Sequence, residues 1–138
     1  MMRALLADDR AVAAVEFASI ATVFLLTIFA IIEFSLFGAN QLALARGLEA
    51  ALRYGVVNGT TACGSQGASA LQAPFNAAAG PLVTGSLPAI AVACSPAGSD
   101  SPGTTLTISA NLSWSPVVFA SDFPTATIAK SVSGVILH

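Results

Sequence analysis

A run of apolar residues near the amino terminus constrains this chain more than any other feature. Residues 17–32 carry no charge, Glu33 interrupts the run, and residues 34–37 continue it. As a helix, residues 17–37 would be about 31 Å long at ~1.5 Å per residue, which matches a hydrocarbon core of about 30 Å. The run is also longer than the apolar region of a cleaved secretory signal. We therefore predict a membrane-spanning helix over residues 17–37.

The pattern that follows the run is amphipathic. Leu44, Leu48 and Leu52, with Ala51, fall on one stripe of a helix. Three charged residues fall on another stripe and fit a solvated face: Arg46, Glu49 and Arg53. The glycines at 47 and 55 are weak points of this helix, and the Asn58-Gly59 pair is a stop signal. We predict one long helix over residues 12–57, with a membrane-spanning part followed by an aqueous stalk.

Strand-like runs follow, separated by loops rich in Pro, Gly, Ser and Asp. Residues 104–114 alternate apolar and polar side chains, with the period of two that a half-buried strand requires. Residues 89–94 and 125–137 are two further runs, although Gly134 weakens the second. Before them, residues 68–79 predict a short helix or turn, because Pro74 breaks the run of helix formers.

These elements together predict an α+β fold. A long N-terminal helix carries a small antiparallel sheet of three to four strands, packed on the distal half of the helix through the leucine stripe. Residues 58–138 would form this small β-rich domain. Trp114 lies on the apolar face of its strand, which predicts a role in core packing.

The two cysteines, Cys63 and Cys94, are 31 positions apart in the β-rich part of the chain. A disulfide between them would tether the loop after the long helix to the first strand. Pairing is the expectation if this part lies outside the cytosol, whereas in the cytosol both would be free buried thiols.

Composition argues against several functions. Only 9% of the residues are charged and the net charge is −2, so the chain lacks the basic patch that nucleic acid requires. Two cysteines and one histidine do not make a zinc site, and His138 is the last residue, a poor place for a catalytic base. Asp100 and Asp122 lie in turn-rich loops. We therefore expect no catalytic residue, no metal, no cofactor and no small-molecule substrate.

The string Ala11-Val12-Ala13-Ala14-Val15-Glu16-Phe17 stands at the threshold of the apolar run. It resembles the processing site of type IV pilin-like proteins, in which a prepilin peptidase removes a short cytoplasmic leader. The resemblance implies a leader over residues 1–11 and a cut between Ala11 and Val12, with Glu16 and Phe17 as the fifth and sixth mature residues. The family usually has glycine before the cut, where this chain has Ala11. The freed amine of Val12 could then neutralise a Glu16 carboxylate, commonly that of a neighbouring subunit.

More narrowly, the chain resembles the TadE-like family, the minor pilins or pseudopilins of Flp (tight-adherence) pilus systems. The resemblance rests on the string above and on three further stretches: IIEF at 31–34, ALRYG at 51–55, and the tail over 114–137. It implies a bacterial inner-membrane protein with its C-terminal domain in the periplasm and the possibility of incorporation into a pilus. Its partners would be other pilin-like subunits and the prepilin peptidase.

Other interpretations stay open. The chain could be a single-pass anchor whose periplasmic domain binds a partner, the major subunit of a filament or, with least support, an enzyme. Glu33 could contact a partner subunit in an assembly, but we favour contact with interfacial water, because it lies about 25 Å along the helix from Glu16.

Overall fold

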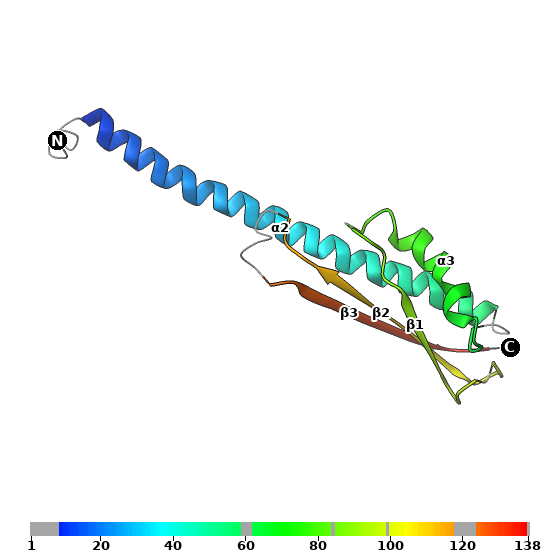
Figure 1. The fold of residues 1–138 in the computed structure, drawn as a ribbon. Coiled ribbons are helices and arrows are strands. Elements are labelled where there is room, and N and C mark those ends of the chain that lie inside the picture. Colours follow the sequence, from blue (N-terminus) through cyan, green and yellow to red (C-terminus); the bar gives the residue numbers. More distant parts are fainter. Residues whose placement is uncertain (1–8, 59–61, 84, 99, 118–123, 138) are drawn as a thin grey trace. The chain divides into compact units, whose positions relative to one another are not determined.

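The computed structural model describes residues 9–58, 62–83, 85–98, 100–117 and 124–137. The chain divides into two compact units, Met1–Ser35 and Leu36–His138. The first unit contributes the N-terminal part of helix α2 (Asp9–Val57), and the second contributes the rest of α2, helix α3 (Gly67–Ala79) and three strands (Figure 1). The predicted α+β fold is confirmed. The predictions for residues 1–8 of the leader, for Asp122 and for His138 lie outside the described residues.

Helix α2 ends where the sequence predicts. Its last residue is Val57, and the following Asn58 donates from both its backbone and its side-chain nitrogen to the Tyr54 carbonyl oxygen, at 2.9 and 3.1 Å. These bonds satisfy one of the carbonyl groups that the last turn of a helix leaves without an intrahelical donor. The Asn58 part of the predicted stop signal therefore acts through its side chain as well as its backbone.

The strands form one antiparallel sheet in the order β1-β2-β3 (Figure 1). Strand β1 covers Ile90–Ser95, β2 covers Thr105–Trp114 and β3 covers Ala126–Val135, each within two residues of its predicted bounds. Ile108 lies opposite Val92 on one side and Val132 on the other, so apolar side chains of all three strands share a face. Two backbone bonds, Gly103 N to Ile136 O and Ile136 N to Thr104 O, extend the β2–β3 pairing beyond the strands.

The core of the second unit lies between this sheet face and the helices. Leu44, Leu48 and Ala51 of α2 are fully buried, as the leucine stripe predicts, and they join a cluster with Leu106 and Ile108 of β2. Trp114 packs at the margin of this cluster, and its ring lies edge-on to that of Phe37 at 5.1 Å between centroids. The predicted packing role of Trp114 is confirmed.

Glycine lets the neighbouring elements approach α2 closely. A Cβ at Gly47 would lie 2.7 Å from the Phe75 ring and 2.9 Å from the Ala79 Cβ, and one at Gly55 would lie 2.6 Å from Leu106 Cδ2. On β3, a Cβ at Gly134 would lie 3.2 Å from Leu52. These glycines, which the sequence marks as weak points, are close-packing positions.

Helix α3 is longer and more regular than the sequence predicts, and it continues through Pro74. A proline inside a helix costs about 3 kcal/mol. The helix persists because Leu71 and Phe75 are fully buried in the core, and burial of two such side chains contributes about 1.5–3 kcal/mol each. The expectation of a break at Pro74 is wrong, because tertiary burial offsets the local penalty.

The side chain of Gln72 joins α3 to the entry of β1. Its Nε2 donates to the Asn76 Oδ1 at 2.7 Å and to the Pro88 carbonyl oxygen at 3.1 Å. Its Oε1 accepts a bond from the Ile90 amide at 3.0 Å. One amide side chain thus satisfies both a donor and an acceptor of the backbone beside the strand, which holds α3 in register with the sheet.

Candidate membrane anchor

The first unit presents large apolar side chains to its surroundings along the described part of α2. Phe17 is 74% exposed and Phe34 is 76% exposed, and most of the large apolar residues between them are more than half exposed. The helix contains a window long and apolar enough to cross a membrane, and only 6% of that window is buried inside the structure. A core helix of a soluble protein of the same composition would be mostly buried. This segment therefore leaves its apolar surface to be covered by something outside its own unit.

Four hydroxyl side chains of the segment form hydrogen bonds with the backbone of their own helix. The hydroxyl groups of Ser19, Thr22, Thr27 and Ser35 each donate to the carbonyl oxygen four residues earlier, at 2.7–2.9 Å. A bilayer offers no water to such groups, so a spanning helix must satisfy them internally. The sequence shows these residues only as weakly polar interruptions, whereas the structure shows that none of these four hydroxyls needs a solvent partner.

The predicted processing residues lie at the start of this surface. Ala11, Val12, Glu16 and Phe17 are all inside α2, so the predicted cut falls within a helical stretch of the intact chain. Val12 and Glu16 are four residues apart and therefore share a face of the helix. Val12, Glu16 and Phe17 are exposed, and so they are open to a neighbour.

Glu33 differs from these residues. It is 7% exposed, although Ile32 and Phe34 on either side of it are exposed. The sequence favoured contact with interfacial water for this carboxylate. In the structure, little of the side chain is presented to solvent.

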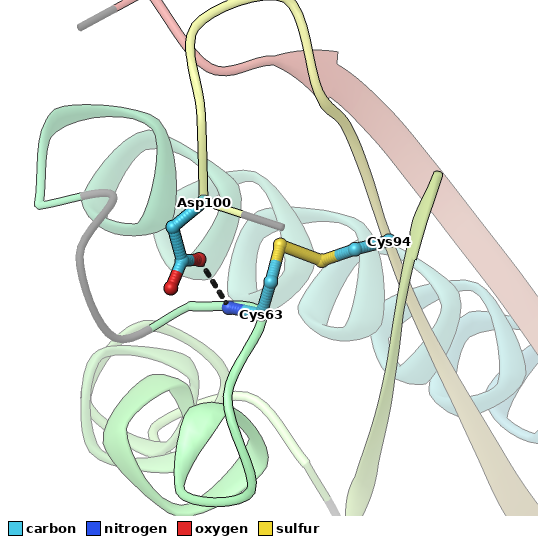
Figure 2. Close-up of a disulfide and its surroundings, with 3 residues drawn as sticks. All are labelled: Cys63, Cys94 and Asp100. Atoms are coloured by element: carbon cyan, nitrogen blue, oxygen red, sulfur yellow. Dashed lines mark hydrogen bonds between the residues drawn. A yellow bond between two sulfur atoms is a disulfide. The ribbon is translucent and has the colours of Figure 1, made fainter. Parts of the chain in front are cut away.

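The predicted disulfide is confirmed in the second unit. Cys63 and Cys94 are bonded, with 5.7 Å between their Cα atoms, and no cysteine is free. Figure 2 shows the bond joining the segment between α2 and α3 to strand β1, as the sequence predicted.

Asp100 reinforces this junction. Its Oδ1 accepts a bond from the Cys63 amide at 2.8 Å, so the loop between β1 and β2 reaches back to the same cysteine (Figure 2). The sequence predicted only a local turn-forming role for Asp100. Its partner is 37 positions away, and no local pattern marks such a contact.

No family model, curated protein or solved structure matches this chain. Among the described residues, no group of three or more His, Cys, Asp or Glu side chains is placed to hold a metal ion. The observations define a class: an α+β protein with a disulfide-linked domain and, near its N-terminus, an apolar helix that could serve as a membrane anchor or signal.

Proposed function

We propose that this chain is a pilin-like structural subunit, a TadE-like minor pilin that takes part in Flp pilus assembly, adhesion or secretion. The observation that carries the proposal is the exposed apolar surface of α2 between Phe17 and Phe34. Covering this surface requires lipid or the apolar helices of other subunits. The resemblance of the Ala11–Phe17 string to a pilin processing site favours a subunit that uses both, first in the membrane and then in an assembly.

In this proposal the leader faces the cytoplasm, residues 17–37 cross the inner membrane and the disulfide-linked domain lies in the periplasm. The Cys63–Cys94 bond supports this orientation, because disulfides persist in the periplasm and are rare in the cytosol. The membrane helix would associate laterally with other pilin-like helices through side-chain packing and small residues. The chain would act by assembly, without catalysing a reaction.

Leader removal gives the helix a second charge at its start. Cleavage between Ala11 and Val12 would free the Val12 amine close to the exposed Glu16 carboxylate of a neighbouring subunit. Opposite charges in a low dielectric are costly apart and favourable together. The pair would therefore set the register of the helices as subunits pack.

The test is the intact mass and N-terminal sequence of the non-reduced protein extracted from membranes. We expect a chain that begins at Val12 and retains the disulfide. The variants Ala11→Gly and Ala11→Leu form a matched pair: glycine should be cut at least as well as alanine, while leucine should block cutting. A wild-type chain that still begins at Met1 in cells with an active prepilin peptidase would contradict the pilin assignment and favour an unprocessed anchor.

A further inference from the structure

The face of the sheet that points away from the helices carries small, uncharged side chains throughout. We call this the open sheet face, and its residues come from alternate positions of the three strands: Ala91, Ala93, Ser95, Thr105, Thr107, Ser109, Asn111, Ser113, Thr127, Ala129, Ser131, Ser133 and Val135. An ordinary soluble domain has about one charged residue in four, so a face of this size would carry roughly three. The open sheet face carries none.

The whole second unit shares this shortage of charge. Over positions 36–138 the sequence has six charged residues, and none of them belongs to the open sheet face: Arg46, Glu49, Arg53, Asp100, Asp122 and Lys130. The single lysine of β3, Lys130, lies on the opposite face, since it pairs with the buried Ala110. Charged side chains spread over a surface usually help to keep soluble domains from associating. This face has no such protection.

Its chemistry is self-complementary. Hydroxyl groups both donate and accept hydrogen bonds, so Ser and Thr can meet Ser and Thr of an identical surface, which a two-fold interface requires. The pairs Thr107–Ser133 and Ser109–Ser131 place such groups side by side at the centre of the face. A face with charges of one sign would repel its own copy. The face has no aromatic side chain, the group on which sugar rings commonly stack, and this favours protein over glycan as the occupant.

We infer that the open sheet face is an interface between two copies of this chain, packed sheet on sheet. Strands β2 and β3 are each ten residues long and β1 is six residues long, so the face measures about 400 Å², or about 800 Å² over two copies. An interface of this size is smaller than the standard class of specific interfaces and is therefore weak. The contact therefore rests on the proposed function in one respect: confinement to a membrane or pilus supplies the local concentration that a weak interface needs.

Cross-linking of the full-length protein in membranes tests this inference. Because both native cysteines are in the disulfide, a Ser131→Cys variant has one reactive thiol, placed on the open sheet face. A short bis-maleimide should link two copies of Ser131→Cys into a species of twice the chain mass. The matched control is Ala77→Cys, on the exposed face of α3, which should give at most about a tenth of that yield.

A charge on the face should prevent the contact. In the Ser131→Cys background, Thr107→Lys should lower the yield at least about tenfold, because two lysines would meet in a closed interface. Ala77→Lys in the same background adds the same charge elsewhere and should leave the yield unchanged. An intact disulfide, shown by the absence of a second titratable thiol, reports that each variant is folded.

Three results would overturn the inference: no linked dimer from Ser131→Cys, equal yields from positions 131 and 77, or a linked product containing a different protein or polymer. A protein that is retained in membranes and cut at Val12 but does not cross-link would refute this interface alone. A protein that cross-links but is neither cut nor membrane-bound would refute the proposed function alone.

Discussion

At position 47, helix propensity favours alanine, whereas packing favours the glycine that is present. Alanine is better than glycine in a helix interior by about 1 kcal/mol. In this protein, a Cβ at Gly47 would lie 2.7 Å from the fully buried Phe75 ring and 2.9 Å from the Ala79 Cβ. Overpacking of this kind costs about 1–3 kcal/mol. We expect the cost of overpacking to exceed the gain in helix propensity, because the atoms that would have to move are inside the core.

We therefore predict that Gly47→Ala lowers the free energy of unfolding by about 1–2 kcal/mol. The matched control is Gly38→Ala on the same helix, where a new Cβ would meet nothing within 4 Å and the stability should be unchanged or higher. Urea denaturation of the full chain in mild detergent, followed by the fluorescence of Trp114, the only tryptophan, measures both. If Gly47→Ala were as stable as Gly38→Ala, helices α2 and α3 would be able to move apart to admit the new methyl group without a cost in stability.

Asp100 contributes through one specific acceptor atom. Asp100→Ala removes the Oδ1 that accepts from the Cys63 amide, and this loss should cost about 1–3 kcal/mol in unfolding free energy. Asp100→Asn keeps an oxygen acceptor without the charge and should cost less. Hydrogen exchange at the Cys63 amide is the direct measurement: it should accelerate most in Asp100→Ala. Unchanged protection of that amide in Asp100→Ala would mean that the bond contributes nothing.

Among the elements, the disulfide couples the segment after α2 to strand β1. The chain between Cys63 and Cys94 includes all of α3, and the separation is 31 positions. Closing a loop of this length is worth about 3–4 kcal/mol in the loop-entropy description. We predict a loss of this size in the double variant Cys63→Ser/Cys94→Ser, measured by urea denaturation. A loss below about 1 kcal/mol would show that packing alone holds α3 against the sheet.

How much of these elements the sequence predicts depends on the range of the contacts. Helix α2 and strand β2 follow from local periodicity, so the C-terminal end of α2, the bounds of β2 and the buried faces of both were predictable. Helix α2 begins at Asp9, three residues before the predicted start. The path of α3 through Pro74 was not, because the burial that stabilises it comes from other elements. The same applies to Gln72, whose partners Pro88 and Ile90 are 16 and 18 positions away. In the candidate anchor, the apolar surface was predictable from the sequence. The hydrogen bonds from the hydroxyl groups to the helix backbone and the burial of Glu33 depend on the three-dimensional structure, and no local pattern marks them.

On the scale of the whole molecule, each of the two units has an exposed surface that lacks charge. The first unit exposes large apolar side chains, and the second unit exposes a neutral sheet face. The apolar surface of the first unit is larger than soluble monomers usually expose, and the sheet face lacks the charges that help to keep soluble domains apart. Both surfaces are compatible with a subunit that is surrounded by lipid and other protein chains. The two proposals therefore rest on the same property, an exposed surface without charge, on α2 and on the open sheet face.

The apolar segment gives the last prediction, which concerns where the molecule resides. Phe24 and Leu26 lie near the middle of residues 17–37 and are exposed. Arginine at the centre of a membrane helix costs about 2.5–3.5 kcal/mol, so Phe24→Arg/Leu26→Arg should oppose insertion by about 5–7 kcal/mol. We expect this variant to leave membranes on alkaline carbonate extraction, while wild type stays. Phe24→Ala/Leu26→Ala shortens the same side chains without adding charge and should stay with wild type. If wild type itself is released by carbonate, or if the arginine variant is retained as fully as the alanine variant, α2 does not span the bilayer and its apolar surface is covered by protein alone.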